Sequence, residues 1–187
     1  MNMSICRAPA RRNFLECAGR LVVAGALSGF VPPALAALPK VRRLQFEHLH
    51  TGETISLVFA VGHRYVPSAL AALNNFLRDH YTGEVGTIDP PLFDLLFQTS
   101  QELGCREPFQ VISGYRCPAT NSSLRLAGGG GVARQSLHME GKAIDVRLPG
   151  VALEDLRDAA ISLQAGGVGF YAREQFVHLD TGRIRSW

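Results

Sequence analysis

The chain has 187 residues, of which 47% are hydrophobic and 19% are charged, and its formal net charge is +3. This length allows one domain with a well-buried core and is too short for two ordinary domains. The scattered glycines and prolines and the modest charge exclude collagen-like, low-complexity and coiled-coil chains. Four cysteines are too sparse for a scaffold that disulfides alone hold together.

The N-terminal segment has the pattern of an export signal. A basic part with the pair Arg11-Arg12 precedes an apolar, uncharged run over residues 21–31, and Ala34-Leu35-Ala36 is a small-residue cleavage site. The apolar run is too short to span a bilayer. The run from Arg11 to Leu15 is similar to a twin-arginine signal, and an ordinary secretory signal that contains two arginines is the alternative.

The net positive charge of the full chain comes from residues 1–36, which we expect to be removed. Their removal leaves residues 37–187 with 15 basic and 15 acidic side chains, so the expected mature domain is neutral. Nucleic acid is therefore not an expected partner. Cys17 precedes the apolar run instead of following it, so we expect no lipid anchor and no stable membrane attachment after cleavage. The expected location is the periplasm.

The first half of the mature part predicts a hairpin, two helices and a strand. Polar and apolar residues alternate up to Thr51-Gly52, and a β-branched run follows, which is typical of a hairpin. Pro67 and the pair Pro90-Pro91 are each typical of the first turn of a helix. The expected elements are strands at 42–50 and 54–59, helices from 67 to near 81–83 and from 90 to 103, and a strand at 109–112.

The second half begins with a long connection, from Ser113 to Ser136, and we expect its four glycines at 128–131 to border a cleft. The elements expected there are a short helix at 121–126, a strand at 143–148, a helix at 153–163 and strands at 168–171 and 176–179. The whole pattern predicts a single α+β domain, with helices packed on a small, mostly antiparallel sheet.

Cys105 and Cys117 remain in the mature part, one on either side of a predicted strand. A disulfide between them and a pair of buried thiols are both open, because geometry decides between the two and the sequence does not show it. Neither has a second cysteine at a zinc-ligand spacing.

Four of the six histidines lie early in the chain. His48 and His50 would share one face of a strand and could hold a metal, but we interpret the pair as a half-exposed strand face. His63 and His80 have no acidic or cysteine partner at a ligand spacing, and we interpret both as surface residues.

The two late histidines differ from these. His138 and Asp145 lie seven residues apart around a turn at Gly141, and His178 on the last predicted strand could supply a third ligand. Two imidazoles and one carboxylate suit zinc, with a fourth position left for water. Such a site lowers the pKa of water towards ~7 and polarises a carbonyl, which suits amide hydrolysis. The spacing alone is not specific.

The residues around this pair resemble a known family. Residues 136–145 fill every fixed position of the S-x-H-x-x-G-x-A-x-D motif of zinc D-alanyl-D-alanine peptidases, and Ser113-Gly114-Tyr115-Arg116 resembles the S-G-Y-R segment of that superfamily. Residues 167–171 and 176–182 are similar to its YcbK-like branch. The resemblance covers about residues 44–187 and implies the Hedgehog/DD-peptidase fold.

The resemblance also implies roles for individual residues. It implies that His138, Asp145 and His178 bind Zn²⁺. It implies that Arg116 lines the site and holds a substrate carboxylate or a developing oxyanion, for which a structural ion pair is the alternative. Ser136 is expected to form a hydrogen bond beside the ligands.

One position departs from the family pattern. Many members carry a carboxylate, as general base, three residues before the last zinc ligand, and here that position is Gln175. Glu174 would point to the opposite face if it lay on a strand. Asp180 shares the face of His178, so we expect it to act as the base or to orient the zinc ligands, and Glu140 is a further candidate.

These features indicate an exported zinc metallopeptidase that hydrolyses amide bonds in the peptide stem of bacterial peptidoglycan. A non-catalytic murein-binding or regulatory domain that keeps the zinc site is the first alternative, and Gln175 favours it. A metal-free structural domain is the second. It predicts no bound zinc and no effect of His138→Ala beyond folding.

Overall fold

One mixed sheet forms the centre of the computed structural model, which describes residues 40–128 and 132–187. Its strand order is β3-β2-β1-β4-β5-β7-β6-β8, and among these strands only the pairs β1/β4 and β6/β8 are parallel. The strands are β1 (Val41–His48), β2 (Thr54–Val61), β3 (Arg64–Tyr65), β4 (Phe109–Ser113), β5 (Ala143–Arg147), β6 (Gly167–Tyr171), β7 (Phe176–Asp180) and β8 (Arg185–Ser186). The predicted α+β class with a mostly antiparallel sheet is confirmed.

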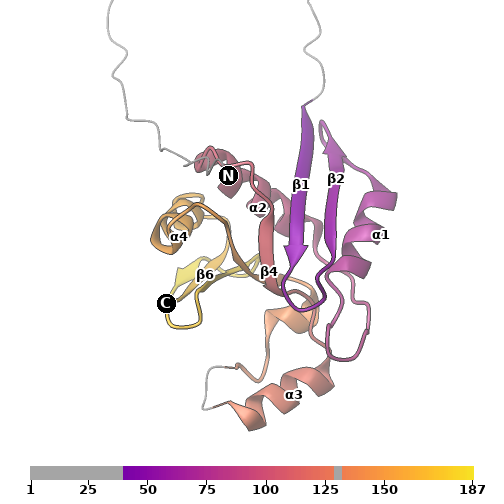
Figure 1. The fold of residues 1–187 in the computed structure, drawn as a ribbon, viewed down its shortest axis with the longest axis vertical. Coiled ribbons are helices and arrows are strands. Elements are labelled where there is room, and N and C mark those ends of the chain that lie inside the picture. Colours follow the sequence, from indigo (N-terminus) through magenta and orange to yellow (C-terminus); the bar gives the residue numbers. More distant parts are fainter. Residues whose placement is uncertain (1–39, 129–131) are drawn as a thin grey trace, which may run out of the picture.

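Four α-helices and one 3-10 helix surround the sheet in the described part of the chain. They are α1 (Pro67–Phe76), α2 (Pro90–Glu102), α3 (Pro118–Ala127), η1 (Leu137–Glu140) and α4 (Leu153–Ser162). The first three each begin with a proline, whose missing N–H has no partner to lose in the first turn. Figure 1 shows α1 beside β2 at one side of the molecule, α4 near β6 at the other, and α3 at the lower end.

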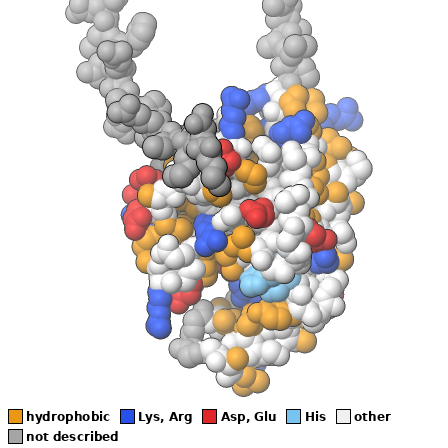
Figure 2. All heavy atoms as spheres, viewed as in Figure 1, with side chains coloured by type: hydrophobic (Ala, Val, Ile, Leu, Met, Phe, Trp, Pro, Cys, Tyr) orange, Lys and Arg blue, Asp and Glu red, His pale blue; other side chains and the backbone are white. Residues whose placement is uncertain are grey.

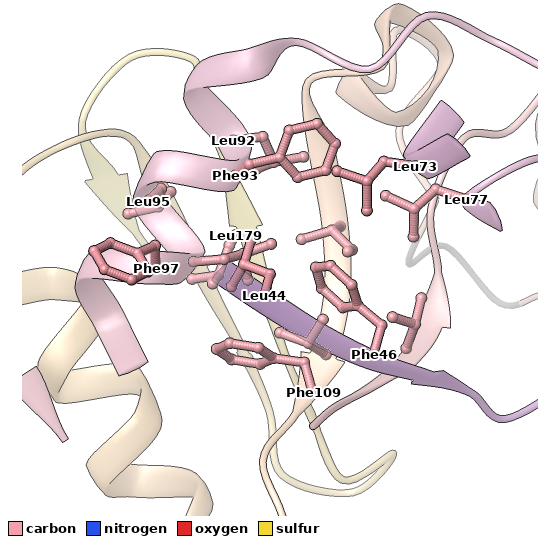
Figure 3. Packing of buried hydrophobic residues seen from close by; sticks show 14 of the residues in the cluster. Leu44, Phe46, Leu73, Leu77, Leu92, Phe93, Leu95, Phe97, Phe109 and Leu179 are labelled. Carbon is pink, nitrogen blue, oxygen red and sulfur yellow. The ribbon is translucent and has the colours of Figure 1, made fainter. Parts of the chain in front are cut away.

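The core lies between α2 and the middle of the sheet. Leu92 and Phe93 of α2 point towards Leu44 and Phe46 of β1 (Figure 3), and each of these side chains is at most 3% exposed. Burial of one such side chain contributes about 1.5–3 kcal/mol relative to leaving it in water. This packing fixes β1, and through β4 it fixes the neighbouring strand β5, which carries part of the site described below.

Two helix boundaries differ from the prediction. Helix α1 ends at Phe76, not near residues 81–83, because the Asp79 carboxylate accepts hydrogen bonds from the backbone N–H groups of Tyr81, Thr82 and Cys117. These bonds form a turn that pins the loop after α1 to the segment before α3. Helix α3 begins at Pro118, earlier than predicted, because the Cys117 sulfur accepts a hydrogen bond from Thr120 N–H and caps it.

The strands β3 and β8 were not predicted, since two residues are too few to show a periodic pattern. The export signal predicted for residues 1–36 lies outside the described residues, and so do glycines 129–131 of the expected cleft border. Among the described residues, none of the helices has the length and hydrophobicity that a membrane span requires. Figure 2 shows acidic and basic side chains interspersed on one face, as expected from the balanced charge of residues 37–187.

Candidate metal centre

The register of the sheet brings two of the predicted ligands together. Strands β5 and β7 are antiparallel, and Asp145 is the direct cross-strand partner of His178. His138 comes from η1, a single turn that Ser136 begins by accepting a hydrogen bond from His138 N–H. Gly141 ends this turn with φ 66°, and a Cβ there would lie 1.9 Å from the Thr87 carbonyl oxygen. The serine and the glycine of the motif are therefore backbone requirements that place the histidine.

Three donor atoms of this triad converge on one point. The distances are 3.3 Å between His138 Nε2 and His178 Nδ1, 3.3 Å between His138 Nε2 and Asp145 Oδ1, and 2.8 Å between His178 Nδ1 and Asp145 Oδ1. Ligands at about 2.0–2.1 Å from a tetrahedral zinc ion lie about 3.3 Å from one another. The donor set therefore fits zinc. In residues 40–128 and 132–187 it is the one group of this kind close enough to hold a metal ion.

The far nitrogen of each imidazole has an oxygen partner. His138 Nδ1 lies 2.7 Å from the Gly114 carbonyl oxygen, and His178 Nε2 lies 3.2 Å from Asp180 Oδ2. Such an acceptor holds the proton on the far nitrogen and leaves the lone pair of the near nitrogen facing the metal position. A Cβ at Gly114 would lie 2.7 Å from the Leu77 carbonyl oxygen, so only glycine allows this segment to approach. Both rings are thus oriented before any ion binds.

The charges of the triad stabilise one another. Burial penalises the charge on Asp145, but His138 and His178 beside it outweigh that penalty and hold the pKa of the carboxyl well below its usual range. Burial lowers the pKa of His138. Burial also acts to lower the pKa of His178, but its hydrogen bonds to Asp145 and Asp180 raise it to about 8. An ionised Asp145 and a neutral His138 are the forms that ligate a metal.

Asp180 is enclosed on all sides. It has no exposed surface, and besides His178 it accepts hydrogen bonds from Arg185 Nη2 at 2.7 Å, Gly182 N–H at 2.8 Å and Gly167 N–H at 3.1 Å. Burial would raise its pKa, but the hydrogen bonds with His178 and Gly182 and the charge of Arg185 hold the pKa below the usual value. Its oxygens are occupied and cannot reach a water molecule in a cavity.

Arg116 lies next to His138, Asp145 and His178. It forms a structural ion pair, the alternative that the sequence left open for this residue. Its Nη2 donates to Asp145 Oδ2 at 2.8 Å, and its Nε donates to Ser113 Oγ at 3.0 Å. The pair leaves Asp145 Oδ1 for the metal position and keeps the guanidinium at the wall of the adjoining cavity. Arg116 therefore both forms a structural ion pair and lines the cavity.

A cavity of about 770 Å³ opens beside the triad. Residues around it include Arg116, Leu124, Tyr171, Glu174, His178 and Trp187. Glu174 lies in the turn between β6 and β7, so the condition under which its side chain would point to the opposite face, a place on a strand, is not met. Gln175 next to it has φ 59° and donates from its amide to the Ala172 carbonyl. Glu140 pairs with Lys142 at 2.8 Å and does not line the cavity.

The positions of His48 and His80 differ from those predicted, which were a half-exposed strand face and the protein surface. His48 is fully buried, and His80 is partly buried between His50 and Tyr81, with ring centroids 4.3 and 4.2 Å away. The ring planes of His50 and His80 are parallel within 2°, so their in-plane lone pairs cannot meet at one ion. The His48 ring meets His50 and His80 edge-on, at 64° and 65°. We call these three residues the stacked cluster after the His50–His80 pair, and within the described residues their donor atoms do not converge on a metal position. His63 is exposed, as predicted.

No disulfide joins Cys105 and Cys117 in the described structure, and both side chains are buried. Of the two possibilities that the sequence left open, the buried thiols are observed. Tyr171, Trp187 and Arg185 were not singled out from the sequence. Strand alternation was the available signal, since Tyr171 lies two residues from Gly169, the cross-strand partner of His178.

An α+β domain with a buried His-Asp-His donor set beside an open cavity has the architecture of a metal-dependent hydrolase. The family model Peptidase_M15_2, described as "Peptidoglycan L,D-endopeptidase MepK", matches residues 36–187, and the chain belongs to this family. The family confirms the predicted resemblance to the peptidase superfamily.

Curated relatives agree with this family. The chain is 45% identical over 179 residues to "Peptidoglycan L,D-endopeptidase MepK" of Escherichia coli (strain K12), which covers 95% of this chain and 96% of that protein. It is 40% identical over 155 residues to the "Probable peptidoglycan L,D-endopeptidase MepK" of Haemophilus influenzae, covering 82% and 83%. No solved structure matches the chain significantly.

Proposed function

We propose that this chain is a zinc peptidase that hydrolyses amide bonds in the peptide part of bacterial peptidoglycan. The observation that carries the proposal is the convergence of His138 Nε2, Asp145 Oδ1 and His178 Nδ1 within 3.3 Å of one another at the wall of a cavity. The relatives named as peptidoglycan L,D-endopeptidases support peptidoglycan as the substrate and cleavage within the peptide.

A zinc ion held by these three residues would polarise the scissile carbonyl and make water more acidic. The protein's own groups carry the rest of the proposed mechanism. Arg116 is fixed by Asp145 and Ser113 and faces the cavity, so its guanidinium is positioned to stabilise the negative charge that develops on the carbonyl oxygen. Asp180 holds the His178 ring through Nε2 and orients it.

Glu174 is our candidate for the group that moves protons. It is the carboxylate that lines the cavity besides the ligand Asp145, whereas Asp180 is enclosed and Glu140 pairs with Lys142 outside it. Its carboxylate would accept a proton from the attacking water and deliver it to the leaving amine. Glu174 would then take the part that Gln175 cannot play.

The test is a digest of purified murein and defined muropeptides, read by chromatography and mass spectrometry. The wild-type protein should release new fragments, and a chelator or His138→Ala should abolish them. Glu174→Gln should lower the rate by about 10²–10⁴-fold, the usual contribution of a general base. Glu140→Gln is the matched control, because it removes a nearby carboxylate that does not line the cavity.

Each other outcome has a defined meaning. Intact muropeptides in the presence of zinc-loaded protein would refute the peptidase and support the murein-binding alternative. Activity gained only in Gln175→Glu would support that alternative further. Equal rates in Glu174→Gln and Glu140→Gln would remove Glu174 from the mechanism while leaving the zinc peptidase intact.

We also propose that residues 1–36 direct export, because peptidoglycan lies outside the cytoplasmic membrane. Replacement of the Arg11-Arg12 pair by lysines should retain the protein in the cytoplasm if the twin-arginine route is used. Unchanged export of this variant, measured by cell fractionation, would instead indicate the ordinary secretory route.

A further inference from the structure

The last residue of the chain is held as firmly as a residue inside a strand. The Trp187 backbone N–H donates to the Val168 carbonyl at 3.2 Å, and its carbonyl oxygen accepts from Phe170 N–H at 2.9 Å. The final residues of a domain are usually poorly ordered unless such bonds tie them down. The backbone of Trp187 is thus fixed along β6.

Three neighbours then fix the indole. Its Nε1–H donates to Tyr171 Oη at 3.1 Å, the Arg185 guanidinium lies 4.8 Å from the ring, and the His178 ring lies 5.5 Å away. Gly169 makes room for the indole, because a Cβ there would lie 2.7 Å from its carbon atoms. Since Gly169 is the cross-strand partner of His178, the indole lies directly beside the proposed zinc ligand.

Despite these contacts, Trp187 is still 50% exposed. Its free surface lines the cavity together with Tyr171, and apolar side chains of the α3 side, Leu124 and Ala127, line the same cavity. A large aromatic surface that is rigid and wet costs little side-chain entropy when a ligand covers it, so it favours binding. Nothing in the proposed bond-breaking steps uses it.

We propose that Trp187 determines substrate affinity, as an aromatic wall that packs on an aliphatic part of the peptide next to the scissile bond. This inference rests on the proposed peptidase function. Trp187 acts in substrate binding and has no role in proton transfer. The competing reading is structural, in which the indole only shields the chain of contacts from Arg185 through Asp180 to His178.

Kinetics separate the two readings. Trp187→Ala should raise KM for a muropeptide about tenfold, leave kcat within about threefold and leave the zinc content unchanged. Trp187→Phe, which keeps an aromatic surface and loses the bond to Tyr171, should restore most of the affinity. Loss of zinc or a large fall in kcat in Trp187→Phe would overturn the proposal in favour of the structural role.

A second measurement does not depend on catalysis and leaves Trp187 itself unchanged. Trp187 is the single tryptophan of the chain, so intrinsic fluorescence reports on this residue alone. In the zinc-loaded full-length protein carrying Glu174→Gln, added muropeptide should protect Trp187 from quenching by acrylamide.

The results distinguish this inference from the proposed function. If the wild-type protein cleaves muropeptide but the peptide does not protect Trp187 from acrylamide, and KM is unchanged in Trp187→Ala, the binding role of Trp187 is refuted. The proposed peptidase function is then unaffected. Protection without any cleavage by the wild-type protein would support the wall and refute the peptidase.

Discussion

Five of the six histidines gather in two places, and the two clusters are built differently. In the triad, His138 and His178 each have an oxygen partner on the far nitrogen, and both point at a shared carboxylate, Asp145. In the cluster of His48, His50 and His80, the His50 and His80 rings stack, and the His48 ring meets both of them edge-on. No carboxylate forms a hydrogen bond with these rings in the described part of the chain.

The two clusters differ in the hydrogen-bond partners of the imidazole nitrogens. His48 Nδ1 faces the backbone N–H of His50 at 3.3 Å, and the Nε2 atoms of His48 and His80 are buried without a hydrogen bond in the described structure. Without a carboxylate hydrogen-bonded to a ring nitrogen to set their orientation, the rings pack as aromatic side chains. The presence of several histidines close together is therefore weak evidence for a metal site, and the outer hydrogen bonds decide.

Removal of a ligand should give the largest contrast between the clusters. His138→Ala should lower the rate of murein cleavage by more than about 100-fold, beyond the usual effect of losing an outer partner of a metal site. His80→Ala, the matched control in the stacked cluster, should change the rate by less than about twofold. Rates are measured on the same muropeptide, and a similar loss in both variants would mean that the clusters do not differ as described.

Removal of an outer partner should have a smaller effect. Asp180→Asn keeps an oxygen for the N–H groups of Gly167 and Gly182 but removes the charge that faces His178. We expect zinc affinity or activity to fall by about 10–100-fold. The measurement is a zinc titration with a competing chelator, with circular dichroism as the folding control. Unchanged affinity and activity would show that Asp180 does not orient the site.

The smallest predicted effect concerns stability in the stacked cluster. Burial, His80 and His50 together lower the pKa of His48 from 6.5 to about 4. The unfolded chain therefore binds a proton below pH 6.5 that the folded chain binds only near pH 4, so the free energy of unfolding falls as the pH falls through this window. Glu53 opposes this shift and Arg78 adds to it.

Urea denaturation at pH 7.5 and pH 5 tests this effect. Between these values the wild-type protein should lose about 1 kcal/mol more than His48→Gln, a value reduced for solvent screening because the cluster borders water at the exposed His50. Comparison with the variant cancels any loss of metal with pH, since both proteins keep the triad. Equal losses in the two proteins would contradict a buried, neutral His48.

The features of the fold and the site that depend on local sequence pattern could be predicted from the sequence. Apolar periodicity and the prolines at Pro67 and Pro90 located α1 and α2, and the motif around His138 indicated the first two ligands. The third proposed ligand, His178, lies 33 residues after Asp145 and was available mainly from the family resemblance. The sheet register that pairs the two is a long-range feature without a local signal.

The predictions that were wrong or missing also concern contacts that have no local signal in the sequence. His80 was interpreted as a surface residue because nothing near it in sequence shows that the loop after α1 packs on the end of β1. Glu174 was weighed only as a residue on a strand, because the left-handed conformation of Gln175, which closes the turn between β6 and β7, is rare for residues other than glycine and has no sequence signal here. Trp187 was passed over because the last residue of a chain is seldom ordered.

We propose that His138, Asp145 and His178 hold one zinc ion and that the stacked cluster holds none. The most direct test is the zinc content, by elemental analysis, of wild-type, His138→Ala and His80→Ala proteins that were loaded with zinc and then dialysed. We expect about one zinc ion per chain in the wild-type and His80→Ala proteins, and almost none in His138→Ala. Zinc retained in His138→Ala but lost in His80→Ala, or no zinc in the wild-type protein, would contradict this proposal.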